Sequence, residues 1–482
     1  MDILDNHLKN GTPVYHISFV GFTVTSCTVA SERAIKYAPE LATDKMWFRT
    51  IHSTCFELVK RYWKQNGIKF KQPLSYQHQN DFCRFAELDL PIKDDDVTDG
   101  TGDLSTGSAF FATATYMANS MLPIDQWTSC PHAAPLIKAE IDFTQIYAEY
   151  GSYKHEHNLM DYDDMLLICA DNNLNVPTTI LIVDEAQDLS PLQYKIITNW
   201  MQDKTHVYLG GDDDQCIYVF QGANSSLMLK FPSNETLVLP KTHRCPPQIW
   251  NAANKLISRN KVRQPKKVEP SNQIGSLKVL QEPEMKEIKQ FINTKKNVFL
   301  LVRTNALVNK LAWRLADEQI VFKYTTDKKE QLYGWTKAKI KIINQVACAF
   351  PHINKRKLLR DLMTKSGLIE YDEILHEWKK GEYTYAFMEK YIGKTIDYDQ
   401  IKTQIGTIHS VKGNEADIVI LFNDLTNKIT VNLDNEQFLE DERKVWYVGM
   451  TRSKLILVIV DGFFVNDTKS IGFQEIVDDN LK

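Results

Sequence analysis

The sequence predicts an α/β fold built on parallel sheets, because of two observations. Six short, β-branched apolar runs recur along its 482 residues, and longer stretches of helical pattern separate them. Runs that are apolar throughout are typical of strands buried on both faces of a parallel sheet. The stretches between them are long enough for crossover helices. The runs are residues 14–22, 179–183, 207–209, 298–302, 418–422 and 455–460.

The first predicted element is the end of a helix at residues 2–9. Three apolar residues recur there at helical spacing, and Asn10 and Gly11 form a typical C-terminal stop signal. The apolar run 14–22 then gives the first strand, and the other five strands follow in the order of their runs.

The six strands fall into two groups, which predict two domains at residues 1–235 and 236–482. Each group is interrupted by a stretch without strand runs, at about 65–165 and about 330–400, which we expect to be mostly helical insertions. The loop 93–108 lacks the glycine and glutamate spacing of an EF-hand, so we expect it to be a solvated loop. A basic cluster, Lys355 to Lys357, predicts a solvated helix face rather than a phosphate contact.

Composition excludes several classes of protein. The net charge is -4, so no basic field supports nucleic-acid binding, and such a function has to rest on local motifs. The eight cysteines form no CxxC pair, which argues against a zinc site or a disulfide framework and favours a reducing compartment. The first ten residues lack the apolar core of a signal peptide, and the longest uncharged stretch, 104–124, is too polar to span a membrane. We therefore expect a cytoplasmic protein without a membrane partner, a nuclear location not being excluded.

The segment LIVDEAQD (181–188) carries the strongest chemical pattern. An apolar strand ends in two acids, and the carboxyl ends of parallel strands face the crevice where ligands bind. Asp184 is placed to hold Mg2+, and Glu185 is placed to orient or deprotonate a water that attacks a γ-phosphate. The alternative is a helix N-terminus, where both acids would only complement the helix dipole.

A second acidic segment, YLGGDDDQCIYVFQGA (208–223), follows another predicted strand. Gln215 is placed to sense the γ-phosphate. Tyr218 and Phe220 come next, and exposed aromatic rings beside a phosphate site suit stacking on unpaired bases. The alternative, that either ring belongs to the core, stays open at this point.

The second half adds three polar segments: THRCPPQI (242–249), GTIHSVKGNEAD (406–417) and DERKVWYVGMTRSK (441–454). They contain Arg244, His409, Glu415 and Arg452. Two arginines from a second domain could clamp a γ-phosphate bound to the first, as arginine fingers do. Taken singly, each arginine is more often part of a surface ion pair.

Together, LIVDEAQD, GDDDQCIY, THRCPPQI, HSVKGNEAD and YVGMTRSK resemble, in order, motifs II to VI of superfamily 1 helicases. The most similar group is the UvrD/Rep/PcrA-like DNA helicases, which includes phage relatives. Three further segments, all upstream of LIVDEAQD, also resemble that family: ISFVGFT (17–23), RTIHSTCFELV (49–59) and MDYDDML (160–166).

The resemblance implies two RecA-like domains with ATP bound between them, and ATP-dependent unwinding with 3′–5′ polarity. The implied cofactors are ATP and Mg2+, and the implied partner is single-stranded or forked DNA. Asp184 and Glu185 match the residues for Mg2+ and the attacking water. Matches to γ-phosphate contacts are Gln215, Arg244 and Arg452. His243 matches an adenine-stacking position and Glu415 a ribose contact. The implied DNA contacts are Phe22, Thr23, His52, Tyr218, Phe220 and His409.

Three departures from the family pattern bear on activity. Phe220 replaces the usual tryptophan and Gln221 the usual arginine, which bears on the strength of the DNA grip. The phosphate-binding P-loop, G-x-x-x-x-G-K-[ST], does not occur in the sequence, since the single GKT at 393–395 has Met388 in place of the first glycine. We expect Met1 to be an internal methionine of a longer protein, or a separate polypeptide to supply the loop. We expect the chain alone to be poorly stable and almost inactive as an ATPase.

Other functions remain as alternatives. The first is a non-enzymatic DNA-binding or regulatory protein that has lost ATP turnover, which the absent P-loop favours and the five ATP-facing motifs disfavour. A helicase–nuclease is less favoured because the sequence contains no acid–lysine nuclease cluster. An RNA translocase is a weaker alternative.

Overall fold

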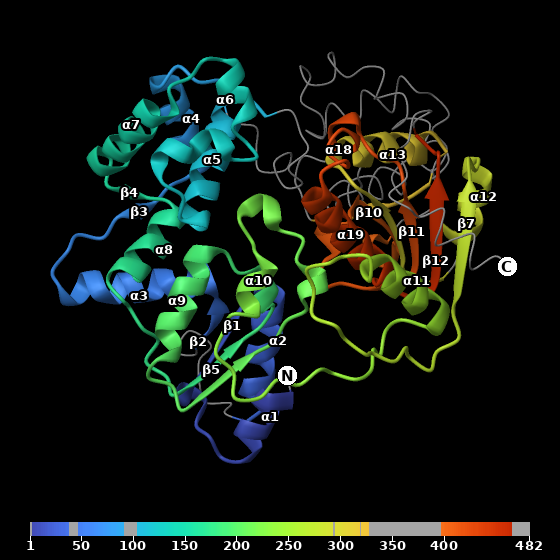
Figure 1. Cartoon of the computed structure of the whole chain (residues 1–482), viewed down its shortest axis with the longest axis horizontal. Coiled ribbons are helices and arrows are strands. Elements are labelled where there is room, and N and C mark those ends of the chain that lie inside the picture. The colour runs from blue at the N-terminus through green and yellow to red at the C-terminus, as the bar shows by residue number, and fades with distance from the viewer. Residues whose placement is uncertain are drawn as a thin grey trace, which may run out of the picture. The chain divides into compact units, whose positions relative to one another are not determined.

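The computed structural model describes residues 2–37, 47–90, 104–292, 295–318, 320–326 and 397–464 (Figure 1). The chain forms two compact units. Unit 1 contains Met1–Leu237 and Lys261–Pro265, and unit 2 contains Val238–Asn260 and Lys266–Lys482. Most of the predicted second insertion, with its basic cluster and the GKT segment, lies outside the described residues, as do residues 93–103 of the predicted loop 93–108. Residues 106–108 of that predicted loop form the first turn of a helix instead. Within the described residues, no helix is both long and apolar enough to cross a membrane.

Unit 1 is built on a four-stranded parallel sheet with the strand order β2-β1-β5-β6. Three of its strands confirm predicted runs, whereas β2 was not predicted, because only Trp47 and Phe48 of its four residues are apolar. The strands are β1 (Ile17–Gly21), β2 (Trp47–Thr50), β5 (Ile180–Val183) and β6 (His206–Leu209).

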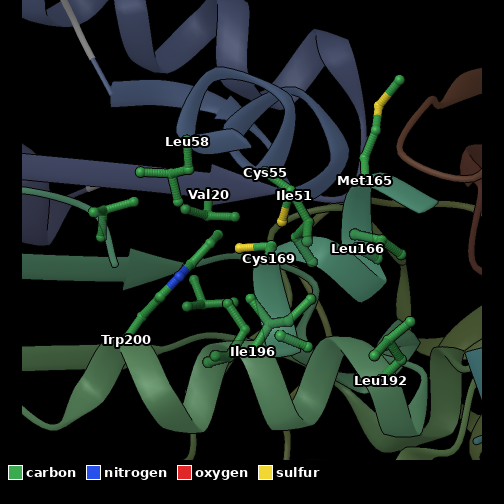
Figure 2. Packing of buried hydrophobic residues seen from close by; sticks show 14 of the residues in the cluster. Val20, Ile51, Cys55, Leu58, Met165, Leu166, Cys169, Leu192, Ile196 and Trp200 are labelled. Carbon is green, nitrogen blue, oxygen red and sulfur yellow. The ribbon is translucent and has the colours of Figure 1, made fainter. Parts of the chain in front are cut away.

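Helices cover both faces of this sheet, which explains why every residue of its central strands β1 and β5 is buried. Successive side chains point to opposite faces of a strand. Val20 packs with Leu58 and Trp200 in one core (Figure 2), whereas Phe19 packs with Leu4 in the other. The covering helices are α1 (Asp2–Lys9), α2 (Val24–Ile35), α3 (Ile51–Gln65), α8 (Tyr162–Asp171) and α9 (Pro191–Met201).

Helix α1 confirms the predicted helix at residues 2–9. Leu4 and Leu8 are buried against the sheet. Gly11 follows with a φ of +81°, a left-handed conformation that glycine adopts without steric cost. The amide of Gly11 donates to the carbonyl of Leu8 at 3.1 Å, and that of Thr12 to the carbonyl of His7 at 3.0 Å. These two bonds satisfy carbonyls that the helix end leaves without partners.

A group of helices between α3 and α8 has its own aromatic core, built on Phe82, Phe110, Phe143 and Tyr150. We call this group, α4 to α7, the helical segment. Short strands β3 (Gln72–Pro73) and β4 (Leu159–Met160) pair in parallel at its ends. Its members are α4 (Tyr76–Phe85), α5 (Thr106–Ser120), the 3-10 turn η3 (Ile124–Ser129), α6 (Ala134–Lys138) and α7 (Phe143–Glu156).

Unit 2 is built on a six-stranded parallel sheet with the order β7-β12-β11-β8-β10-β9. The predicted runs at 298–302, 418–422 and 455–460 are confirmed as β8, β11 and β12. Strands β7, β9 and β10 were not among the six predicted runs, because polar residues such as Lys278, Lys323 and Gln404 interrupt them. The strands are β7 (Ser276–Gln281), β8 (Val298–Val302), β9 (Lys323–Tyr324), β10 (Thr403–Thr407), β11 (Ala416–Phe422) and β12 (Ser453–Asp461).

Helices pack on the sheet of unit 2, whose central strands β8 and β11 are buried except at Asp417. The helices flanking it are α11 (Pro247–Ile257), α12 (Met285–Ile292), α13 (Asn305–Asp317), the short α18 (Asn427–Thr430) and α19 (Glu436–Met450). The described parts of both units are therefore mixed α/β with parallel sheets.

Candidate functional site

The predicted residues of unit 1 follow directly after the carboxyl ends of its strands. Phe22 follows β1, Asp184 follows β5, and His52 lies just after β2. The loop that carries Gln215 follows β6. Because the four strands are parallel and aligned in register, these residues meet at one edge of the sheet. The amide of Asp184 still donates to the carbonyl of Val20 at 2.9 Å, so sheet pairing continues up to the site.

Asp184 and Glu185 form a pair of acids at the end of β5. Burial raises the pKa of the Asp184 carboxyl, and the charge of Glu185 raises it further. Within the described part of the chain, no lysine or arginine forms an ion pair with Asp184. A divalent cation would relieve both effects, and carboxylate oxygens are the ligands that Mg2+ prefers. The residues present therefore fit a magnesium ion held at Asp184.

Gln187 joins the two acidic loops and is fully buried. Its Nε2 donates to a carboxylate oxygen of Glu185, and its Oε1 accepts a bond of 3.0 Å from the amide of Asp212. Gln215 donates in turn to the Asp212 carboxylate at 2.7 Å. Gly211 lies tightly against this link, since a Cβ there would stand 2.7 Å from Gln187 Oε1. No role was predicted for Gln187, because Asp212, the residue that it joins to Glu185, lies 25 positions away in the sequence.

The other two acids of the second loop bind protein groups. Asp214 forms a two-pronged ion pair with Arg263, with Nε and Nη2 donating at 2.9 and 2.7 Å. Asp213 accepts a bond of 2.7 Å from the amide of Gln264. The carboxylates of Asp212, Asp213 and Asp214 lie within 4.8 Å of one another. Because two of the three are committed to Arg263 and Gln264, we assign them a structural role rather than a metal site.

The predicted DNA-binding rings of unit 1 lie together beside the acids. Phe22 and Tyr218 stack with ring centroids 5.0 Å apart, and Phe220 lies 6.2 Å from Tyr218. All three side chains are half-buried, so each combines packing with an accessible surface. Burial raises the pKa of the Tyr218 hydroxyl, with the nearby acids adding to the effect. Thr23 caps helix α2, because its hydroxyl oxygen accepts from the amide of Ser26 at 3.3 Å.

His52 meets a ring that had no assigned role. Tyr162, the first residue of α8, lies edge-on to His52 with centroids 6.1 Å apart and is 67% exposed. Burial lowers the pKa of the His52 imidazole, so its neutral form is favoured. The sequence feature that could have indicated Tyr162 as part of the site is a tyrosine directly after the aspartate that caps α8.

Unit 2 brings together three of its predicted residues. Arg244 Nε donates to a Glu415 oxygen at 2.8 Å, and its Nη1 donates to the carbonyl of Thr451 at 3.3 Å. Arg452 is almost fully buried, and its Nη2 donates to the Thr451 hydroxyl at 3.2 Å. The bond from Arg244, with Lys454 nearby, lowers the pKa of Glu415. The two arginines therefore meet at Thr451, and Arg244 pairs with an acid of its own unit.

The two predicted histidines of unit 2 lie in different surroundings. His243 is exposed and precedes Arg244. His409 is buried and follows the carboxyl end of β10, whereas Glu415 and Arg452 precede the amino ends of β11 and β12. The two edges of the sheet are about 20 Å apart, because β11 has 7 residues. The structure therefore does not bring His409 to the arginine cluster.

Comparison with known proteins identifies the family. The model of the UvrD/REP helicase N-terminal domain matches residues 3–235. The model of the UvrD-like helicase C-terminal domain matches residues 384–461. The chain belongs to the UvrD-like helicases. Of the residues predicted for the site, only His243 and Arg244 fall between the two matched ranges of this helicase family.

Several relatives of the UvrD-like family resemble parts of the chain. The putative ATP-dependent DNA helicase YjcD of Bacillus subtilis is 26% identical over 353 residues, which cover 67% of this chain and 44% of the relative. The ATP-dependent DNA helicase Rep of Buchnera aphidicola (subsp. Baizongia pistaciae) is 33% identical over 156 residues, 28% of this chain and 23% of the relative. A probable DNA helicase II homolog of Mycoplasma capricolum is 28% identical over 269 residues, 49% of this chain and 36% of the relative. The chain spans less than half the length of each of these helicases.

Proposed function

We propose that this chain carries the motor part of an ATP-dependent DNA helicase, which hydrolyses ATP while it moves along single-stranded DNA in the 3′–5′ direction. The observation that carries the proposal is the set of residues that meet at the carboxyl ends of the strands of the unit 1 sheet. An acid pair, a glutamine link and a stack of aromatic rings lie together there on the three loops that follow β1, β5 and β6. Membership of the UvrD-like family supports the same function, and the polarity rests on the family resemblance alone.

The proposed hydrolysis uses the acids at the end of β5. Asp184 would hold the Mg2+ that accompanies ATP, and the ion would neutralise charge on the phosphates. Glu185 would accept a proton from the water that attacks the γ-phosphate. Gln187 fixes the Glu185 carboxylate and joins it to the loop of Gln215, so a change at the acid pair reaches that loop.

The proposed DNA track uses the rings that follow Gln215. Tyr218 and Phe220 come three and five residues after it, and Phe22 stacks on Tyr218. Every base has a flat face, so such a track accepts many sequences. His52 and Tyr162 extend the aromatic surface to β2 and α8. Thr23, the N-cap of α2 beside Phe22, remains a proposed DNA contact. His409 is the weakest member of the proposed DNA-binding set because its ring is buried.

Residues of unit 2 complete the proposed nucleotide contacts. Arg244 and Arg452 are proposed to contact the γ-phosphate, His243 the adenine and Glu415 the ribose. Arg244 and Glu415 bind each other in the structure. In this proposal, each releases the other when ATP binds and contacts the nucleotide instead. ATP and Mg2+ are the proposed cofactors, and single-stranded or forked DNA is the proposed partner.

Single-strand binding tests the proposal on the chain as it stands. Tyr218→Ala and Phe220→Ala each remove one stacking ring, so each should weaken binding of a labelled oligothymidine by about 1–3 kcal/mol, or about 5- to 150-fold. Fluorescence anisotropy measures the affinity, and a mixed-sequence oligonucleotide should give losses of similar size.

Tyr15→Ala is the matched control for these variants. Tyr15 is 59% exposed and precedes the amino end of β1, at the opposite edge of the sheet from the proposed track. It should leave DNA affinity unchanged. Parental affinity in folded Tyr218→Ala and Phe220→Ala proteins would show that both rings serve the core, and the proposed DNA track would be wrong.

A further inference from the structure

The loop that carries Phe220 rests on a buried histidine of the helical segment. His132 Nε2 lies 2.8 Å from the carbonyl oxygen of Phe220, and the side chain of His132 is 5% exposed. A carbonyl oxygen only accepts hydrogen bonds, so Nε2 carries the proton in this bond. The two residues stand 88 positions apart in the chain. The contact therefore joins two elements with separate cores.

A second contact between the same elements lies two residues further along the loop. Gly222 has a φ of +92°, and a Cβ there would stand 3.0 Å from Ser120 Oγ and 3.4 Å from Asn119 Cβ. A side chain at position 222 would meet both backbone strain and the end of α5. The loop is thus held against the helical segment on both sides of Gln221.

The end of α5 is itself fixed to the rest of unit 1. Asn119 Nδ2 donates to Asp163 of α8 at 2.8 Å, and its Oδ1 accepts from the Ser190 hydroxyl at 3.0 Å. Ser190 caps α9, the helix that follows the acid pair. The helical segment therefore provides a support whose position is set by α8 and α9.

We propose that His132 is a positioning residue for the single-strand track, which holds the Phe220 backbone so that its ring is presented to DNA bases. The inference rests on the proposed function and adds a residue outside the helicase motifs. One hydrogen bond that orders a loop is worth about 0.5–1.5 kcal/mol, which corresponds to about a 2- to 10-fold change in affinity. Without the bond, part of the free energy of DNA binding would be used to order the loop.

A pair of variants isolates the hydrogen bond. Methionine and glutamine have similar length, but only glutamine has an N–H to donate. His132→Met should weaken binding of an oligothymidine about 2- to 10-fold, and His132→Gln should restore affinity close to that of the parent. Thermal unfolding of each variant checks the fold. A His132→Met protein that fails to fold while His132→Gln folds would show that the bond holds the helical segment together, and would overturn the assignment.

A double-mutant cycle distinguishes positioning from general support. If His132 acts through the Phe220 ring, His132→Met should add no loss of affinity in a Phe220→Ala background. A 2-aminopurine base in the oligonucleotide should also show less stacking quench with His132→Met than with the parent. Losses that multiply, or an unchanged affinity in His132→Met, would overturn the inference. Unchanged affinity in Phe220→Ala would instead contradict the proposed DNA track itself.

Discussion

Glu185 shows most directly how a single residue combines strain with chemistry. Its backbone lies in the left-handed region, with a φ of +58° and a ψ of +40°. A residue with a side chain pays about 1–3 kcal/mol for such a conformation, so it persists only where the surroundings impose it. Here the surroundings are the bond from Gln187 and the amide of Ala186, which donates to Gly210 at 2.9 Å. The turn places Glu185 beside Asp184 at the end of the strand.

We predict that Glu185→Gln keeps nucleotide binding and loses turnover. The amide preserves the size and the left-handed turn but cannot accept the proton from water. The measurement is DNA-stimulated ATPase activity together with nucleotide affinity, on a version of the protein that carries a G-x-x-x-x-G-K-[ST] loop and its strand ahead of Met1. Asp203→Asn is a control, because Asp203 is an exposed acid of the same unit and should leave turnover unchanged. Parental turnover in Glu185→Gln would rule out Glu185 as the base.

At the residue scale, the side chains that the sequence marked most clearly are those that directly follow an apolar strand run. Asp184 and Glu185 stand out because two acids end such a run, and parallel pairing then fixes their edge of the sheet. Gln187 and His132 carry no such sign, since each has its role through a partner 25 or 88 positions away. The pairing of Arg244 with Glu415, 171 positions apart, was beyond reach for the same reason.

At the element scale, the start of α8 holds a half-buried acidic network. Asp163 accepts bonds from Thr115 at 2.7 Å and Asn119 at 2.8 Å, both on α5. Burial and the charge of neighbouring Asp161 raise the pKa of Asp163 to about 7. Lys154 of α7 lies between Asp161 and Asp164, at 2.6 and 2.8 Å, and opposes the effect. The junction of the helical segment with α8 is therefore sensitive to protonation.

We predict that Asp163→Asn changes how the stability of the protein depends on pH. The folded state holds the Asp163 proton more tightly than the unfolded chain does, so the unfolded chain binds fewer protons between pH 3.8 and about 7. The contribution of Asp163 to the free energy of unfolding is therefore present at low pH and falls as the pH rises through that window. Because the variant lacks this titration, the melting temperature of the variant minus that of the parent should increase as the pH rises from 5 to 8. Each 1 kcal/mol corresponds to about 2–4 °C.

Asp171→Asn, at the exposed end of the same helix, is the control and should show a constant difference from the parent. A difference between Asp163→Asn and the parent that also stays constant with pH would contradict the assignment of a raised pKa to Asp163.

Elements were predictable where they are apolar on both faces or clearly capped. Strands β1, β5 and β8 are buried throughout, β11 is buried except at Asp417, and α1 is followed by Gly11, which has a positive φ. β2 and β7, which are both edge strands, escaped prediction because polar residues interrupt their apolar runs, Arg49 in β2 and Lys278 in β7. Tertiary pairing, rather than local sequence, decides such edge strands.

At the scale of the whole molecule, the chain passes between the two units three times, after Leu237, Asn260 and Pro265. The five residues Lys261–Pro265 belong to unit 1, although both neighbouring stretches belong to unit 2. The ion pair of Arg263 with Asp214 fixes this short return. No feature of the sequence indicated it, because the acids and the arginine are 49 positions apart.

We predict that Arg263→Ala strongly destabilises unit 1. The Asp214 side chain is 2% exposed and that of Arg263 is 13% exposed, so the variant leaves a buried carboxylate without its main counter-charge. Breaking such a pair costs about 3–5 kcal/mol. Urea unfolding should show this loss, and Arg263→Ala combined with Asp214→Asn should recover part of it. Arg84→Ala, which breaks an exposed pair with Asp81, should cost well under 1 kcal/mol. Equal effects of Arg263→Ala and Arg84→Ala would contradict the role of the buried pair.

The return of Lys261–Pro265 also determines what a single nick in the chain would produce. Leu237 and Leu239, at the first passage between the units, are 78% and 73% exposed, so a protease reaches the backbone there readily. The amino-terminal fragment would then lack Arg263 and Gln264, which would stay with the other fragment. Unit 1 could be whole only as an assembly of two polypeptides, with the salt bridge between Asp214 and Arg263 as one of their joints. The amino-terminal fragment alone is thus not a complete unit 1, and its connectivity predicts that it needs the residues Lys261–Pro265 of the other fragment to complete it.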